Sequence, residues 1–326
     1  MPLSPRRFPP ALVSGARVGL IAPSGPLRDK TELEQGIQNV RMLGWEPVVG
    51  EYVLERDGYL AGSDEHRVAD LNRFARDESI EAIWCLRGGY GAMRLLDKID
   101  YDAFAKRPRA LIGYSDITAL HAAIGQRANL VTFHGPTARV ELTPFTRASF
   151  AEAMSLEAGA TMACRGGAMM PLVGGRASGR LVGGNLALVT ALSGTPYAWD
   201  FDGAILVLED VSEQVYRIDR MLTQLRLSGA FDRLAGLAFG SFTEIPDDTA
   251  NAERSLEPVL REFAERVGVP AVMNFPIGHV PDHLTVPLGA MADLDADDCA
   301  FCAYANDRPQ RSCSTEHTSS STDKKS

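Results

Sequence analysis

Hydrophobic and polar positions follow two alternating periods along the first half of the chain. Short apolar runs predict buried strands at 18–22, 46–49, 80–86 and 110–112. Apolar residues at helical spacing predict helices at 31–43, 64–76 and 93–99, and a further helix that begins at Asp116. Strands that alternate with helices in this way predict parallel βαβ units, and hence a doubly wound, mostly parallel sheet.

The second half continues the alternation less regularly. Apolar runs predict strands at 204–208 and 234–239, and helical spacing predicts helices that end near 192 and span 215–227 and 256–267. The segment 271–294 is strand-like and rich in turn residues. This pattern predicts a smaller C-terminal α/β domain.

The composition changes at residues 157–178, where glycines and a proline mark a crossover without clear periodicity. We therefore expect a first α/β domain at 1–156, a crossover linker at 157–178 and the C-terminal domain at 179–307. Residues 308–326 are rich in Ser and Thr and almost free of apolar side chains, which predicts a disordered tail.

Composition narrows the range of functions. The 326 residues are 45% hydrophobic and 23% charged, which is typical of a soluble globular protein with a sizeable core. The net charge of −9 argues against general nucleic-acid binding, because an acidic protein repels phosphate backbones. No apolar run is long enough to span a bilayer.

The cysteines bear on compartment and on metal binding. Five cysteines in no regular framework fit a reducing compartment, so we expect a cytoplasmic protein. Cys299 and Cys302 have no second Cys or His pair at zinc spacing, so we expect no metal site.

Ser115 lies at a corner where a buried strand is followed by a helix. A tight turn there would lift its hydroxyl clear of the sheet, and the helix N-terminus would supply free N–H groups and positive potential. The corner matches only the first half of the Gly-x-Ser-x-Gly pattern, because Ile117 replaces the second glycine. The alternative is that Ser115 or Asp116 only caps the helix.

A nucleophilic serine needs a base and an acid that orients the base. His134, directly after a probable strand, and His279, in a turn flanked by prolines, are the candidate bases. Either could instead be a structural histidine that bonds a loop carbonyl. Glu209 is the candidate acid, because it follows four apolar residues and a buried carboxylate needs a partner. Its neighbour Asp210 can cap the helix that follows.

An acyl-transfer site also needs N–H donors for the oxyanion. The amide of Asp116 is one candidate. The other comes from the glycine-rich segment 86–91, whose backbone can turn inward where side chains would prevent it. A phosphate-binding loop is the alternative, but the spacing is not Gly-x-Gly-x-x-Gly and no Lys-Ser/Thr follows.

Seven short segments in order give the chain a resemblance to the LD-carboxypeptidases (muramoyltetrapeptide carboxypeptidases), a family of serine peptidases. They are IAPSG (21–25), RGGYG (87–91), GYSD (113–116), FHGP (133–136), GGNL (183–186), LED (208–210) and GH (278–279). The resemblance runs from about Val18 to about Asp293.

The resemblance implies a catalytic triad of Ser115, Glu209 and His279, with an oxyanion hole from the amides of Gly89 and Asp116. It also implies two domains with the site at their interface, a homodimer, and no need for a metal or another cofactor.

The reaction implied is removal of the terminal D-alanine from a cytoplasmic murein tetrapeptide during cell-wall recycling, through an acyl-enzyme. Arg87, beside the oxyanion loop, is the candidate partner for the free carboxylate, although an arginine at a strand end can equally be a surface or structural ion-pair residue. His134 and Asn185 are further candidates for substrate binding near the site.

Two other functions remain open. A branch of the family resembles microcin-immunity peptidases, which cleave aminoacyl or peptidyl adenylate analogues and tend to carry a longer second domain with a base-stacking aromatic residue. Here the region between Gly135 and Gly183 is short, and Trp199 is the only Trp of the second half, which favours the murein enzyme. A non-catalytic nucleotide- or small-molecule-binding protein would explain the glycine loop but not the separate Ser, Glu and His turns.

Overall fold

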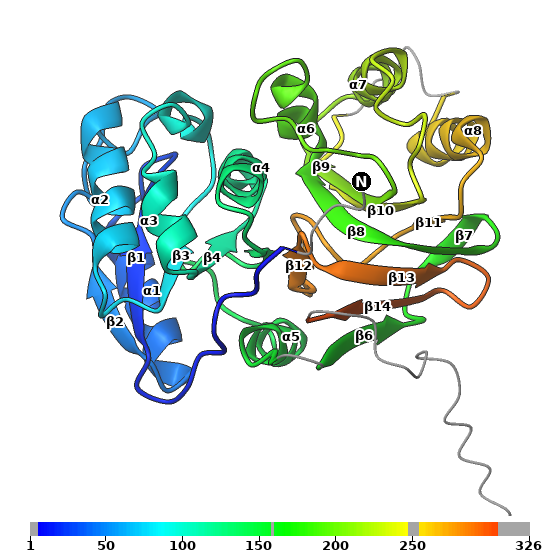
Figure 1. Ribbon diagram of the computed structural model, residues 1–326. Helices are drawn as coiled ribbons and strands as arrows, with labels where there is room; N and C mark the ends of the chain where they lie inside the picture. The colour runs from blue at the N-terminus through cyan, green and yellow to red at the C-terminus, as the bar shows by residue number, and fades with distance from the viewer. Residues whose placement is uncertain (1–5, 158–159, 247–253, 306–326) are drawn as a thin grey trace, which may run out of the picture.

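A computed structural model describes residues 6–157, 160–246 and 254–305, and two β-sheets organise these residues (Figure 1). The first sheet has the strand order β12-β5-β4-β3-β1-β2, and the second has the order β6-β14-β13-β8-β9-β10-β11-β7. The α/β class, with a mostly parallel N-terminal sheet and a second α/β domain, is therefore confirmed. The tail predicted at 308–326 lies outside the described residues.

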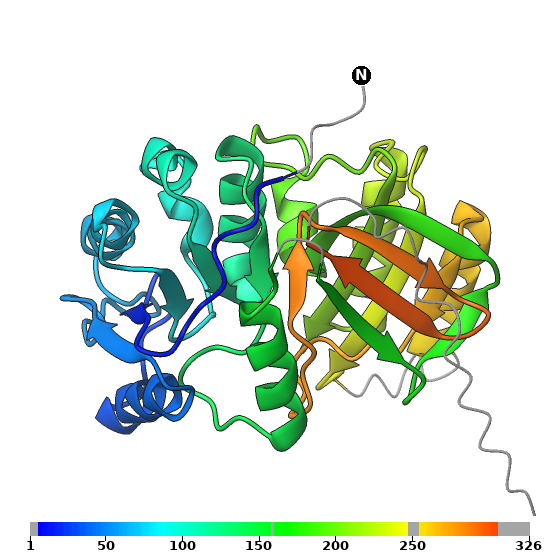
Figure 2. The same ribbon diagram turned by 60° about the horizontal axis from the view of Figure 1, so that its bottom comes forward.

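Five of the six strands of the first sheet run parallel, and helices cover the sheet on both faces. The parallel strands are β1 (Arg17–Ile21), β2 (Glu46–Val49), β3 (Ala82–Cys85), β4 (Ala110–Gly113) and β5 (Thr132–His134). Its helices are α1 (Lys30–Met42), α2 (Asp64–Arg76), α3 (Tyr101–Lys106), α4 (Thr118–Arg127) and α5 (Pro144–Met154), with 3₁₀ turns η1 (Ala92–Leu95) and η2 (Ser115–Ile117). Figure 2 shows α1 and α5 on one face and α2, α3 and α4 on the other. Burial from both sides explains why the central strands are continuous apolar runs.

The second sheet is mixed. Its strands are β6 (Thr161–Arg165), β7 (Met170–Val173), β8 (Arg176–Asn185), β9 (Ala204–Val211), β10 (Gly236–Thr243), β11 (Ala271–Met273), β13 (Met291–Asp295) and β14 (Ala300–Tyr304). Strands β8 to β11 run parallel, and the remaining pairings are antiparallel. Its helices α6 (Leu186–Leu192), α7 (Val215–Leu227) and α8 (Leu256–Val267) cover one face (Figure 1).

Two local predictions differ from the structure. Residues 157–178 are more than a linker, because they contain β6 and β7 at the two edges of the second sheet. Each of these edge strands buries a single residue, so the sequence carries no clear alternation there. The helix expected at 93–99 is wrong, since η1 is a 3₁₀ turn that ends at Leu95.

One strand of the C-terminal half belongs to the first sheet. Strand β12 (Val286–Leu288) pairs antiparallel with β5, which places Val286 opposite His134. The chain thus returns to the N-terminal sheet before β13 re-enters the second sheet. The C-terminal domain expected at 179–307 therefore lends an edge strand to its neighbour, and this ties the two sheets together.

Three buried histidines meet where this strand enters the first sheet. The ring of His134 on β5 lies 5.3 Å from that of His283, just before β12, and 6.4 Å from that of His121 on α4. His121 Nε2 lies 2.8 Å from the Gly113 carbonyl oxygen, while the other five ring nitrogens have no hydrogen-bond partner among the described residues. Burial lowers the pKa of His121 to about 4 and that of His283 to about 3, and it holds the pKa of His134 well below its usual value.

This cluster predicts that acid weakens the fold. In the unfolded chain a histidine protonates below about pH 6.5, whereas His283 stays neutral in the folded protein, so its stabilising contribution falls as the pH drops from 6.5 toward 3. At pH 5 the loss is about 2 kcal/mol for this histidine. Urea unfolding at pH 7 and pH 5 measures it, and His283→Gln should flatten the pH dependence. Equal slopes for the two proteins would contradict the prediction.

Candidate active site

Ser115 occupies a tight backbone corner between β4 and α4. Its φ is 65°, in the left-handed region that residues with side chains rarely adopt. The residue is half-buried, and the 3₁₀ turn that it begins leads into α4 at Thr118. Neither Ser115 nor Asp116 makes a side-chain cap bond to these turns, so the capping alternative is wrong. The corner instead presents a hydroxyl at the carboxyl end of a buried strand, above the N-terminus of a helix.

The glycine-rich loop after β3 lies directly against this serine. A Cβ atom added to Gly88 would stand 2.9 Å from Ser115 Cβ and 3.1 Å from Ser115 Oγ. Gly89 has a φ of 114°, and a Cβ there would stand 3.1 Å from Gly25 Cα. Only glycines allow this close approach. The structure therefore brings the loop that carries Gly89 to the serine, and an oxyanion role for its amide remains a prediction.

Glu209 and His279 form a hydrogen-bonded pair. The distance from His279 Nδ1 to Glu209 Oε2 is 2.9 Å, and the carboxylate is fully buried while the imidazole remains 21% exposed. When Nδ1–H donates a hydrogen bond to the carboxylate, Nε2 is unprotonated and can take a proton from another group. The sequence predicted that the strand ends at residue 208, before Glu209. In the structure β9 extends to Val211, so Glu209 lies within the strand.

The backbone before His279 is fixed to the neighbouring strand β10. The Phe275 amide donates to the Phe239 carbonyl at 2.9 Å, and the Ser241 amide donates to the Ile277 carbonyl at 2.8 Å. Gly278 has a φ of 122°, and a Cβ there would stand 3.2 Å from Glu209 Cβ. This turn carries His279 across to the first domain, where its ring centre lies 4.8 Å from that of Tyr114, the neighbour of Ser115 in the chain.

Asn185 joins the two domains behind the site. Its amide donates to Thr118 Oγ1 at the start of α4 at 3.0 Å, and its side chain donates to Asp210 Oδ1 at 2.9 Å and accepts from the Leu188 amide. The residue is 4% exposed, so it supports the interface rather than offering a free surface to substrate. Strand pairing places Asn185 opposite Glu209.

Asp210 does not cap the helix that follows it in the chain. Its Oδ2 accepts from the Ala187 amide at 3.0 Å, at the N-terminus of α6, and burial raises its pKa to about 6. The expected capping of α7 is therefore wrong. Parallel pairing of β8 with β9 brings Asp210 to the start of α6, a long-range neighbour that sequence spacing could not reveal.

Two further candidates occupy different environments. Arg87 is half-buried, and its Nη1 donates to the Pro26 carbonyl. Among the described residues no carboxylate lies within ion-pair distance of it. His134 is fully buried, with its ring 6.1 Å from that of Tyr114, so it lies behind the site and does not line its surface.

Sequence reasoning missed Tyr114. Its ring lies near three imidazoles, those of His279, His283 and His134, and burial raises the pKa of its hydroxyl. An aromatic residue between Gly113 and Ser115 was visible in the sequence. Its partners could not be identified there, because two of them come from the C-terminal half.

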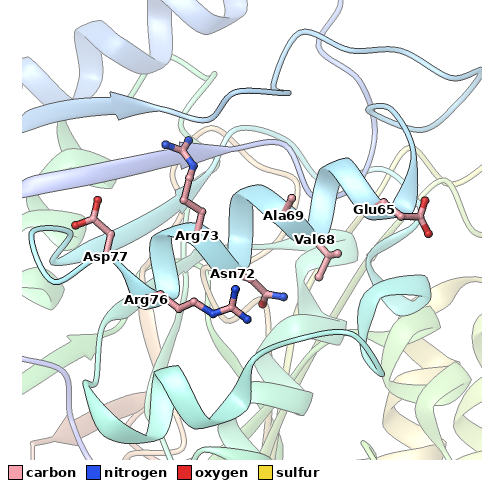
Figure 3. Close-up of a pocket in the computed structure, with 7 residues that line it drawn as sticks. All are labelled: Glu65, Val68, Ala69, Asn72, Arg73, Arg76 and Asp77. Atoms are coloured by element: carbon pink, nitrogen blue, oxygen red, sulfur yellow. The ribbon is translucent and has the colours of Figure 1, made fainter.

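A surface hollow lies elsewhere, along the outer face of α2 (Figure 3). It is lined by Glu65, Val68, Ala69, Asn72, Arg73, Arg76 and Asp77. None of these residues contacts the Ser115, Glu209 or His279 side chains. In the described ranges, no three His, Cys, Asp or Glu side chains converge as a metal ion would need, and no helix is long and apolar enough to cross a membrane.

Comparison with known proteins identifies the family of the chain. Residues 18–135 match the LD-carboxypeptidase N-terminal domain, and residues 178–294 match the LD-carboxypeptidase C-terminal domain. A probable murein peptide carboxypeptidase of Bacillus subtilis is 38% identical, over 88% of this chain and 91% of the relative. The murein tetrapeptide carboxypeptidase of Pseudomonas aeruginosa is 36% identical, over 86% of this chain and 94% of the relative.

Solved structures agree on the fold. A muramoyltetrapeptide carboxypeptidase from Oxalobacter formigenes superposes with a TM-score of 0.79 at 29% identity, covering 90% of this chain and 99% of that one. The microcin C7 self-immunity protein MccF, in complex with aspartyl sulfamoyl adenosine, gives a TM-score of 0.84 at 25% identity, covering 91% and 98%. The chain therefore belongs to the LD-carboxypeptidase family and is a serine-type peptidase.

Proposed function

We propose that this peptidase releases the terminal D-alanine from murein tetrapeptides in the cytoplasm, through a Ser115–His279–Glu209 triad. Ser115 Oγ attacks the carbonyl at the L-centre while His279 Nε2 takes its proton. The imidazolium then protonates the leaving D-alanine, and water hydrolyses the acyl-enzyme with the same histidine as base. The amides of Gly89 and Asp116 stabilise the oxyanion.

The observation that carries the proposal is the buried Glu209–His279 hydrogen bond beside the left-handed Ser115 corner. A buried carboxylate favours the protonated imidazole that forms during attack, because an opposite charge at close range stabilises it. The contact between the rings of His279 and Tyr114, the residue before Ser115, supports this pairing of base and nucleophile. The names of the relatives supply the murein peptide as substrate class.

Arg87 is the proposed partner of the free carboxylate of the D-alanine. Its neighbours Arg28 and Arg139 both pair with Glu32, at 3.9 Å and 2.6 Å, while Arg87 has no such carboxylate among the described residues. Burial lowers the pKa of its guanidinium, since desolvation disfavours the charge. A bound carboxylate would stabilise that charge and so oppose the lowering of the pKa. Guanidinium groups suit this task, because they bind carboxylates through two parallel hydrogen bonds.

The adenylate-analogue amidase is the second candidate, supported by the likeness to MccF with its bound sulfamoyl adenosine. Here Trp199 is 4% exposed and lies under the Arg6 guanidinium, so it cannot stack on a base. This favours the murein substrate. A homodimer, and the absence of nucleic-acid partners, stay predictions from the family resemblance and the net charge.

The choice of substrate tests the proposal. Purified protein should release D-alanine from a murein tetrapeptide at least about tenfold faster, in kcat/KM, than it cleaves aspartyl sulfamoyl adenosine, because no exposed Trp is available for the base. Chromatographic quantification of D-alanine and of the released nucleoside sulfamate measures both rates on one preparation. The reverse preference would assign the chain to the microcin-immunity branch.

Ser115→Ala should lower kcat for D-alanine release by about 10³-fold or more, because the nucleophile is removed. Binding of the tetrapeptide, followed by calorimetry, should persist, since the rest of the site is intact. Ser155→Ala, an exposed serine after α5, is the matched control and should keep full activity. A fully active Ser115→Ala protein would exclude the serine mechanism.

Glu209→Gln should lower kcat by about 10³- to 10⁴-fold with little change in KM. The amide is close in volume to the carboxylate, but it does not stabilise an imidazolium and it can hold the wrong tautomer of His279. Steady-state kinetics on the tetrapeptide measure the split. Glu213→Gln is the control. Glu213 lies just beyond the end of β9, and its side chain pairs with Arg217. A drop in both proteins would point to a general loss of charge instead.

A further inference from the structure

One peptide unit of the glycine loop is held by two buried side chains of opposite charge. The carbonyl oxygen of Gly91 accepts a hydrogen bond from Arg67 Nη1 at 3.0 Å. The N–H of Ala92, at the other end of the same peptide unit, donates to Asp116 Oδ2 at 2.8 Å. Arg67 and Asp116 are each 2% exposed, so both contacts are shielded from water.

Each of these side chains reaches a second part of the site. Arg67 Nη1 also donates to the Pro23 carbonyl, in the loop after β1 that carries Gly25, and the Gly25 amide donates to the Gly88 carbonyl at 3.0 Å. Asp116 follows Ser115 in the chain, and its own amide is the second proposed oxyanion donor. The loop that carries Gly89 is therefore held at both ends.

Backbone contacts give the loop part of its support, because the Gly25 amide donates to the Gly88 carbonyl and the Arg94 amide donates to the Gly91 carbonyl at 3.1 Å. Gly89 and Gly91 have φ values of 114° and 121°, and the Gly89 backbone is exposed. Glycines lose more conformational freedom on folding than other residues do, so a glycine-rich loop is flexible unless contacts with other groups fix its backbone. A Cβ at Gly91 would stand 2.9 Å from Arg67 Nη1, which shows how closely the guanidinium fits the backbone.

We propose that Arg67 and Asp116 are positioning residues of the oxyanion hole, which fix the Gly91–Ala92 peptide and thereby aim the Gly89 amide at the oxyanion. The inference deepens the proposed function and rests on it. Arg67 forms its ion pair with Asp64 and not with Asp116. What Arg67 and Asp116 share is therefore the Gly91–Ala92 peptide that both of them bind. Burial raises the pKa of the Asp116 carboxyl, and the Ala92 amide and the Arg67 charge oppose that rise.

Oxyanion donors act on the transition state, so a misaligned donor lowers kcat and leaves substrate binding unchanged. Asp116→Ala should lower kcat for D-alanine release by about ten- to a hundredfold with KM unchanged. Its affinity for a boronic-acid analogue of the acyl peptide should fall by a similar factor. That analogue forms a bond from Ser115 Oγ to boron, passes the serine proton to His279 and places a boronate oxygen in the oxyanion hole. Affinity for the tripeptide product should not change.

Asp70→Asn is the matched control. Asp70 is 3% exposed and accepts hydrogen bonds from the amides of Glu51 and Tyr52 at 2.8 and 3.0 Å, in a loop away from Ser115. Like Asp116, it is a buried carboxylate that accepts hydrogen bonds from backbone amides, but the backbone that it holds has no part in the proposed reaction. Its loss should lower the melting temperature and leave kcat and boronate affinity at wild-type values.

Arg67→Lys and the double variant with Asp116→Ala complete the test. Because both side chains hold one peptide, their effects on kcat should be less than additive. Wild-type kcat and boronate affinity in Asp116→Ala, or an equal loss of kcat in Asp70→Asn, would overturn the inference. The proposed function fails separately, when Ser115→Ala remains active, and an inactive Ser115→Ala beside a fully active Asp116→Ala would overturn the positioning role alone.

Discussion

The hydrogen bond between His279 and Glu209 is the interaction on which the rest of the site depends. Glu209 is fully buried in β9, and its Oε1 has no partner among the described residues, so its charge is compensated chiefly through Oε2. Removing an ionised carboxylate from water without a partner is expensive. The carboxylate therefore holds the imidazole in place through Nδ1, and this leaves Nε2 for the role of base that we propose.

The Glu209–His279 pair can act on Ser115 only if the two domains keep a fixed position relative to each other. Asn185 provides part of it, because it lies opposite Glu209 in the second sheet while its amide donates to Thr118, three residues after Ser115. A short chain of contacts thus links the Ser115 corner to Glu209. Strand β12 provides the rest, since its pairing with β5 secures the segment that follows His279.

The sequence predicted the elements that are buried on both faces and failed where structure depends on a partner elsewhere. The central strands of the first sheet were apolar runs, and the Ser115 corner was visible from its residues alone. Strand β12 lay within the segment 271–294 that was predicted to be strand-like, but it could not be singled out, because Pro287 stands in its middle and proline argues against a strand. It is tolerated here because β12 is an edge strand, which needs no donor on its outer side. The positions of Asn185 and Asp210 follow from strand register, which no local pattern specifies.

The chain on both sides of His279 is held by backbone pairing, and this limits how the two domains can separate. Before His279, the backbone is hydrogen-bonded to β10, and after it the chain enters β12 within the first sheet. Separating the two domains as rigid bodies would have to break either the β12–β5 ladder or the contacts of the 275–278 segment. A rigid-body opening of the two domains therefore carries the cost of these backbone hydrogen bonds.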